Sequence, residues 1–290
     1  MKALVVVNPV AGQGRTLKVL PKVKAEFHKA SCQAEIFQTK FPGEATLVAK
    51  RAVREGYDAV VAIGGDGTIS EIVNGVAGSS VNLGVIPTGT VDVFSREMKI
   101  PFQVHSACKV IFEGKTKRID LGQANSRYFV LVAGVGIDAQ LVRDVSPEVK
   151  RVLKDLAYPL TGIKTLLTYK PTLMKINLNG KSTEEGYFVV VGNARYYAGR
   201  FSITSKASIS DGFLDVCIFK KGNLGSFVRY IQGVVRGKHL KYSDVKYVKV
   251  REVLIESSHP SLVQADGDLI GQTPMNFRVA PRALSVFAPD

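Results

Sequence analysis

Two short runs of glycine and aspartate contain the residues of this sequence best suited to chemistry. The first is Gly64–Thr68 (GGDGT), and the second is Asp266–Asp268 (DGD). Glycine lets a backbone approach a phosphate group closely, and the free N–H groups at the start of a helix attract an anion. A carboxylate in such a place repels phosphate unless a cation or a hydroxyl group separates them. Asp66 therefore indicates Mg²⁺ or a substrate hydroxyl, whereas in a plain tight turn it would only cap the next helix.

The first run lies between a strand pattern and a helix pattern. Ala59–Ile63 is a short apolar segment rich in β-branched residues, which is typical of a buried parallel strand. After the glycines, apolar residues recur at helical spacing from Ile69 to Val76. A strand, a glycine turn and a helix N-terminus in succession predict a phosphate-binding turn.

Two more strand-to-helix junctions contain glycine. Lys2–Val7 predicts a buried strand that ends in Asn8–Gly12, and Leu83–Ile86 predicts another that ends in Pro87–Thr90. Turns at the carboxyl ends of neighbouring parallel strands meet at one edge of a sheet. We therefore expect the three glycine turns to form a single nucleotide site. Thr39, at the end of a further strand pattern, either contacts this nucleotide through its hydroxyl or lies in an ordinary surface turn.

The alternation of strands and helices stops about two fifths of the way along the chain. It continues to about residue 118 and changes near Ile119–Gly122. From there on, strand-like runs dominate, and several alternate apolar with polar residues. Asn179-Gly180 predicts a hairpin turn, and helical insertions are expected near Glu148–Tyr169 and Gly225–Gly237. The sequence thus predicts an α/β domain followed by a mostly β domain.

The chain is strongly basic, with 290 residues and a formal net charge of +14. This indicates anionic partners: nucleotide phosphates, nucleic acid or an acidic membrane surface. Nucleic acid is not expected, because no helix-turn-helix, RNP or zinc pattern accompanies the charge. The helical insertions mix basic and aromatic residues and form either a membrane-surface patch or a solvated basic surface. The basic residues are Arg143, Lys150, Arg151, Lys154, Lys164 and Lys170, and then Lys220, Lys221, Arg229, Arg236, Lys238, Lys241, Lys246, Lys249 and Arg251.

Membrane-spanning and disulfide patterns are missing from the sequence. No apolar run approaches the roughly 18 residues of a transmembrane helix, and Met1–Val10 matches a short strand rather than a signal peptide. Cys32, Cys108 and Cys217 are widely spaced and odd in number, which fits small buried residues in a reducing compartment. We expect a cytoplasmic protein that is peripheral at the inner face of the membrane. No pattern indicates an oligomeric state.

Seven segments occur in an order that matches a known family. Together they resemble the diacylglycerol kinase catalytic-domain family, in particular its soluble bacterial lipid kinases, which are related to sphingosine and ceramide kinases. The resemblance covers nearly the whole chain, and the ordered set is more specific than GGDGT alone. The segments are NPVAGQG at 8–14, GGDGTISEIVNG at 64–75, GVIPTGTVDVFSRE at 84–97, DLG at 120–122, GVGIDAQLV at 134–142, SISDGFLDV at 208–216 and VQADGD at 263–268.

The resemblance implies two domains with the active site in the cleft between them. The first, expected at residues 1–121, has an α/β fold like that of NAD kinases and phosphofructokinases. The second, expected at 122–281, is β-sandwich-like. In such proteins the last strand can return to the first domain, so residues 282–290 are expected there.

The resemblance also implies ATP and Mg²⁺, with a lipid substrate as the acceptor. Asp66 is expected to organise Mg²⁺–ATP in the first domain. A Mg²⁺ site in the second domain matches Asp211, with backbone oxygens near Ser208 and Phe213. The residues expected at the nucleotide are Asn8, Pro9, Gly12, Thr39, Gly64, Gly65, Asp66, Gly67, Thr68, Glu71, Thr88, Gly89 and Thr90.

Three acids of the second half complete the expected site. Asp268 takes the position of the family's general base. Asp120 and Asp266 are expected to support the metal or the acceptor, although Asp120 would also suit a strand end and Asp266 a turn. The family often has Asn-Asp at positions 92–93, where this chain has Asp92 and Val93, and Glu in place of Asp268.

The function expected from these residues is an ATP- and Mg²⁺-dependent lipid kinase that acts at the membrane surface. The hydroxyl of a lipid such as diacylglycerol would receive the phosphoryl group. The departures at Val93 and Asp268 leave one alternative, a catalytically weak protein that binds nucleotide or lipid on the same fold. A second alternative is an enzyme like NAD kinase with a soluble acceptor, which would share GGDG but not the DGFLDV or GVGIDA segments.

Overall fold

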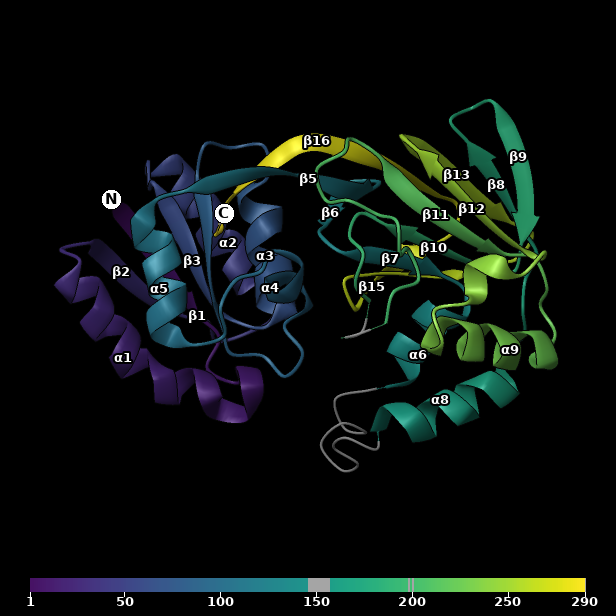
Figure 1. Ribbon diagram of the computed structural model, residues 1–290, viewed down its shortest axis with the longest axis horizontal. Helices are drawn as coiled ribbons and strands as arrows, with labels where there is room; N and C mark the ends of the chain where they lie inside the picture. Colours follow the sequence, from purple (N-terminus) through teal and green to yellow (C-terminus); the bar gives the residue numbers. More distant parts are fainter. Residues whose placement is uncertain (146–156, 198, 200, 290) are drawn as a thin grey trace.

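The computed structural model describes residues 1–145, 157–197, 199 and 201–289. It has an α/β part and a β-rich part, which are connected by long strands that run between them (Figure 1). Lys150, Arg151 and Lys154, together with the start of the insertion predicted from Glu148, lie outside the described residues.

Four parallel strands form the centre of the α/β part. Every residue of the strand Ala59–Gly64 is buried, because helices cover both faces of the sheet, and this explains its uninterrupted apolar sequence. The strand order is β2 (Gln33–Gln38), β1 (Lys2–Val7), β3 (Ala59–Gly64) and β4 (Asn82–Pro87). The helices are η1 (Ala11–Gly14), α1 (Arg15–Lys29), α2 (Glu44–Arg54), α3 (Asp66–Val76), α4 (Val93–Glu97) and α5 (Val104–Glu113).

Two sheets pack face to face in the β-rich part, and their core includes Met174, Ile176, Val216 and Phe277. One sheet continues from β4 through β16 (Met275–Phe287), β13 (Glu252–Ser257), β8 (Met174–Leu178) and β9 (Ser182–Gly186), and β5 (Thr116–Ala124) pairs with β16 and with β6 (Arg127–Phe129). The other is antiparallel, in the order β12 (Val245–Val250), β11 (Leu214–Phe219), β10 (Phe188–Gly192), β7 (Val132–Val135), β14 (Leu262–Ala265) and β15 (Asp268–Gln272).

Strand β16 belongs to both parts of the molecule. It is antiparallel to β13 at its start and parallel to β4 at its end, where Ser285 and Val286 lie beside Asn82 and Leu83. Strand β5 is antiparallel to β16 along most of the length of β16. It continues without a break through residue 121, where the first predicted domain ends. The boundaries 1–121, 122–281 and 282–290 stay predictions.

Three helices lie on one side of the β-rich part (Figure 1). They are α6 (Ile137–Asp144), α8 (Ala157–Thr168) and α9 (Leu224–Val235), and η3 (His239–Lys241) follows α9. Tyr230 of α9 packs on Phe219 of β11, with ring centroids 4.8 Å apart. In the described ranges, no helix is both long and apolar enough to cross a bilayer.

The predicted fold class, an α/β domain with a β-sandwich-like second domain, is confirmed. The hairpin prediction is also confirmed, since Asn179 and Gly180 join β8 to β9 with φ angles of 53° and 67°. The insertion predicted at Gly225–Gly237 is helix α9. The three cysteines are free, and Cys108 and Cys217 are buried.

Candidate active site

The three glycine turns lie against one another at the carboxyl ends of β1, β3 and β4. The hydroxyl oxygens of Thr16 and Thr88 are 2.7 Å apart. Gly12 packs so tightly here that a Cβ would lie 1.8 Å from the carbonyl oxygen of Thr88. A Cβ on Gly89 would lie 2.7 Å from the Cα of Gly65. The sheet therefore brings together the turns that the sequence predicts to share a nucleotide.

Asn8 joins the first turn to the second. Its side-chain N–H donates to Thr68 Oγ1 at 3.1 Å, and its Oδ1 accepts from the N–H of Val10 at 3.2 Å. A Cβ on Gly64 would come within 2.4 Å of the same Thr68 hydroxyl, whereas a Cβ on Gly67 would have no atom within 4 Å. Close packing at Gly64 fixes the turn, and the open space at Gly67 leaves room for an anion at the start of α3.

The carboxylate of Asp66 binds the start of a different helix. Its two oxygens accept the backbone N–H groups of Val93 and Phe94 at 3.0 and 2.9 Å. These groups belong to the first turn of α4 and have no partner inside that helix. Asp66 therefore does not cap α3, whose N-cap is Gly65. It holds the turn after β4 against the turn after β3.

Asp92 is a second carboxylate in these turns, and it is only 3% exposed. Its backbone has a φ of 50°, and its Oδ1 accepts the N–H of Gly89 at 3.0 Å. Burial, followed by the negative charge of Asp66, raises the pKa of Asp92 to about 6. The sequence identified this position only as a departure from the family's Asn, which would accept the same hydrogen bond without a charge.

Asp266 contributes a carboxylate from the second domain. The backbone N–H groups of Val130, Leu131 and Val132 donate to it at 2.7, 2.9 and 3.2 Å. Burial and the negative charge of Asp66 nevertheless raise the pKa of Asp266 to about 6, against the effect of these donors. Val130 lies two residues after Tyr128, whose backbone binds Asn74 of α3. The segment that holds Asp266 therefore also contacts the helix that follows the first glycine run.

Asp268 begins β15 and is paired with a cation. The Nη2 of Arg127 lies 2.6 Å from Asp268 Oδ2, and half of the Asp268 side chain is exposed. Arg127 comes from β6 and was not predicted as a site residue, because no motif connects it with Asp268. The charge-assisted hydrogen bond holds the carboxylate in one orientation.

Two further contacts fix the first domain against the second. Asn74 of α3 exchanges two hydrogen bonds with the backbone of Tyr128, each 2.9 Å long. Glu97 of α4 accepts the N–H groups of Arg195 and Tyr196 at 3.2 and 3.3 Å, and burial raises its pKa. Both contacts join residues that are far apart in the sequence, so no local pattern indicated them.

Two family models divide the chain between them. Residues 2–124 match the diacylglycerol kinase catalytic domain, and residues 131–288 match the YegS C-terminal NAD kinase beta sandwich-like domain. A protein of Staphylococcus aureus (strain bovine RF122 / ET3-1) named diacylglycerol kinase is 32% identical over 292 residues, which cover 100% of this chain and 93% of that protein. The chain belongs to the diacylglycerol kinase catalytic-domain family.

Solved structures agree with this assignment. The crystal structure of a diacylglycerol kinase from Bacillus anthracis str. Sterne has a TM-score of 0.81 and 28% identity, and covers 99% of this chain and 97% of its own. A second crystal structure from that organism has a TM-score of 0.84 at 28% identity, and covers 99% of this chain and 95% of its own. The predicted family is confirmed, and with it the prediction of a kinase.

Some residues expected at the nucleotide of this diacylglycerol kinase family member have structural contacts. Glu71 accepts the N–H of Ala45 at 3.1 Å and so caps α2. Thr39 donates its N–H to the carbonyl oxygen of Val7 at 2.9 Å, beside the end of β1. Pro9 is partly buried in the first turn, and Thr90 is exposed at the end of the third.

The Mg²⁺ site expected at Asp211 contains a lysine. The Nζ of Lys249 lies 2.5 Å from Asp211 Oδ2 and 4.0 Å from the fully buried carboxylate of Asp215. The other oxygen of Asp211 accepts the N–H of Phe213 at 3.2 Å, and the carbonyl oxygen of Ser208 accepts the N–H of Asp211 at 3.4 Å. In the described part of the chain, no three His, Cys, Asp or Glu side chains gather as metal ligands. The residues therefore do not fit a metal here, because an ammonium group already neutralises the carboxylate.

Asp120, expected in the same network, binds two backbone segments. Its carboxylate is 1% exposed and accepts the N–H groups of Gly212 and Arg282 at 2.7 Å each. Arg282 has a φ of 51° where β16 bends. Asp120 therefore joins the Asp211 loop and the bend of β16 to β5.

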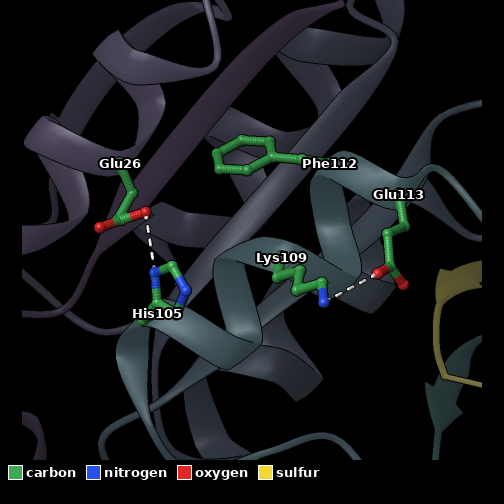
Figure 2. Close-up of a pocket in the computed structure, with 5 residues that line it drawn as sticks. All are labelled: Glu26, His105, Lys109, Phe112 and Glu113. Atoms are coloured by element: carbon green, nitrogen blue, oxygen red, sulfur yellow. Dashed lines mark hydrogen bonds and ion pairs between the residues drawn. The ribbon is translucent and has the colours of Figure 1, made fainter.

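A cavity of about 270 Å³ lies elsewhere, between α1 and α5 (Figure 2). His105 Nδ1 is 3.1 Å from Glu26 Oε2, and Lys109 Nζ is 3.7 Å from Glu113 Oε1. Phe112 completes the lining. None of the predicted site residues lines this cavity, so it is not part of the candidate active site.

Removing the ammonium group of Lys249 should expose the Asp211 site. Asp211 and Asp215 would lose their cation, so we expect Lys249→Met to lower the free energy of unfolding by about 1–3 kcal/mol. Mg²⁺ without nucleotide should raise the melting temperature of this variant but not of the wild type. Lys246→Met, on the same strand, is the control. Equal stabilisation of the wild type by Mg²⁺ would show that Lys249 does not replace the metal.

Replacing Asp92 by Asn should remove a buried charge and keep the turn. Folding raises the pKa of Asp92 from 3.8 to about 6, so its ionised form opposes folding above pH 6. We expect Asp92→Asn to increase the free energy of unfolding at pH 8 by on the order of 2 kcal/mol. The gain should shrink as the wild-type carboxyl group becomes protonated between pH 6 and 4. Urea unfolding measures it, with the exposed Glu185→Gln as control. A gain independent of pH would contradict the assignment.

Proposed function

We propose that this protein is an ATP- and Mg²⁺-dependent lipid kinase whose active site lies between its two domains. The observation that carries the proposal is the pair of hydrogen bonds between Asn74 of α3 and the backbone of Tyr128, just before the segment that holds Asp266. It supports a site in which the glycine turns lie beside the Asp-Gly-Asp run that would supply the base. The acceptor class follows from full-length similarity to a protein named diacylglycerol kinase.

ATP binds at the three glycine turns in this proposal. The start of α3 offers free N–H groups to a phosphate group, and Gly67 leaves the approach open. The proposed ATP-binding residues are the thirteen that the sequence analysis names, from Asn8 to Thr90. Glu71 and Thr39 contribute by fixing α2 and the end of β2, since their contacts are with the protein itself.

The acids near the phosphates fit a cation brought with the nucleotide. Burial, with a smaller contribution from the negative charge of Asp66, raises the pKa of both Asp92 and Asp266. Mg²⁺ bound with ATP would neutralise charge on the phosphate oxygens. Asp66 is the residue that we assign to hold it, with Asp266 in support.

Asp268 acts as the general base. It takes the proton of the lipid hydroxyl as the hydroxyl oxygen bonds to the γ-phosphorus and ADP leaves. Arg127 keeps the carboxylate oriented through its 2.6 Å ion pair. The chain thus supplies a base on one domain and phosphate donors on the other.

A catalytically weak binding protein is the second candidate. The contact that favours it is the same ion pair, because an Asp held by Arg127 reaches less far than the family's Glu. Incubation with labelled ATP, Mg²⁺ and mixed lipid micelles separates the candidates. Label in the organic phase supports the lipid kinase, and nucleotide binding without transfer supports the second candidate. Label on a water-soluble dinucleotide would instead indicate an enzyme like NAD kinase.

The proposed site of action is the cytoplasmic face of the membrane. A lipid with a hydroxyl group and apolar tails resides in a bilayer, so a kinase that acts on it must reach that surface. The net charge of +14 favours peripheral contact with anionic lipid.

Replacing Asp268 by Asn should abolish transfer while nucleotide binding stays nearly unchanged. General base catalysis contributes about 10²- to 10⁴-fold to a rate, so we expect kcat to fall by at least about 100-fold. Transfer of label to lipid gives kcat, and binding of a non-hydrolysable ATP analogue gives the affinity. Asp268→Glu, which restores the family's residue, is the control and should remain active. Full turnover by Asp268→Asn would exclude Asp268 as the base.

A further inference from the structure

Helix α9 carries an apolar stripe on its outer face. Leu224, Val228, Ile231 and Val235 follow one another at helical spacing, and 45%, 39%, 53% and 59% of their surfaces are exposed. The opposite face of the helix, with Phe227 and Tyr230, is buried against the β-rich part. An apolar row of this length on a surface helix indicates a binding partner.

The exposed charges that flank this α9 stripe are mostly positive, and the nearby Asp244 is buried and paired with Arg229. Residues 220–243 contain six Lys and Arg and no Asp or Glu. Lys221 precedes the helix, and Arg236, Lys238 and Lys241 follow it. These four are exposed, and none forms an ion pair with another residue in the described ranges. In neighbouring α8, Lys164 adds a cation and Leu167 an exposed apolar side chain, and Lys170 adds a second cation just after the helix.

We propose that the α9 stripe is the surface by which the protein docks on an anionic lipid bilayer. Apolar side chains flanked by lysines match acyl chains beneath negatively charged headgroups. A second copy of this chain would bring the same cations face to face, which repel. Nucleic acid offers phosphates but no apolar layer for the four aliphatic side chains.

The stripe is connected to the strands that carry the proposed base. Phe227 of α9 packs on Tyr169 at the end of α8, with ring centroids 6.1 Å apart. Thr165 of α8 donates to Asp144 of α6 at 2.7 Å. Gln264 donates to Asp138 of α6 at 2.6 Å, and it lies two residues before Asp266. Figure 1 shows α6, α8 and α9 on the same side of the β-rich part.

The inference rests on the proposed lipid kinase function, since docking there holds the Asp266–Asp268 turn near the bilayer. Its test is binding to vesicles of phosphatidylglycerol and phosphatidylcholine, compared with phosphatidylcholine alone. We expect the wild type to bind only the anionic vesicles and to dissociate as salt is added, because salt screens exposed charges. No binding to the anionic vesicles, or equal binding to both kinds, would overturn the proposal.

Variants on the exposed surface locate the contact. Val228→Ser with Ile231→Ser, and separately Arg236→Glu with Lys238→Glu, should each weaken binding at least tenfold. The controls are on α2 of the first domain: Leu47→Ser, and Lys50→Glu with Arg54→Glu, all at exposed positions. Wild-type binding by both α9 variants would overturn the proposal. The proposal would also be overturned if the wild type is a dimer, the serine variant is a monomer, and the two bind vesicles equally.

A short-chain, water-soluble diacylglycerol separates this proposal from the proposed function. The α9 variants should phosphorylate it as the wild type does, and lose activity only on vesicles. Loss of activity on both substrates would contradict a docking role. If the wild type binds anionic vesicles but phosphorylates no lipid, the proposed function fails and the docking surface stands.

Discussion

The backbone hydrogen bonds that fix Asp66 and Asp266 are the constraint on which the rest of the site depends. Two backbone N–H groups of α4 hold the first carboxylate, and three N–H groups before and at the start of β7 hold the second. Because backbone donors are fixed by the fold, neither carboxylate is free to turn. Burial raises the pKa of Asp266, and the negative charge of Asp66 adds a smaller increase. A site with this charge arrangement favours a cation that arrives with phosphate groups.

The fold keeps the two carboxylates apposed through contacts outside the glycine turns. Asn74 joins α3 to β6 through two backbone hydrogen bonds. Asp120 joins β5 to the bend of β16, the strand that continues the sheet of the α/β part into the β-rich part. The Asp266 turn itself needs left-handed backbone, with φ angles of 50° and 89° at Asp266 and Gly267. The side chains of Asn74 and Asp120 each bind backbone groups of a distant segment, so these contacts hold the backbone of the two segments together.

Local patterns predicted the fold and the hairpin, since buried strands, glycine turns and a hairpin each have a short sequence signal. The convergence of the three turns followed from parallel strand topology. The partners of the acids did not follow, because Arg127 with Asp268 and Asn74 with Tyr128 join distant segments. The metal site expected at Asp211 was carried over from the family, and the ion pair of Asp211 with Lys249, which lies opposite Asp215 on the neighbouring strand, was not predicted. Predicting which side chains lie opposite each other on neighbouring strands requires knowledge of the strand register.

The central claim, that acids of the two domains form one site, is tested most directly by titrating Asp266. Carbon-13 NMR of labelled aspartate follows its carboxyl group in the wild type and in Asp66→Asn. The wild type should titrate with a pKa of about 6. Asp66→Asn should lower that pKa, because it removes a negative charge while the backbone donors to Asp266 stay in place. An unchanged pKa would show that Asp66 and Asp266 do not face each other, and the two runs would then not form a common active site.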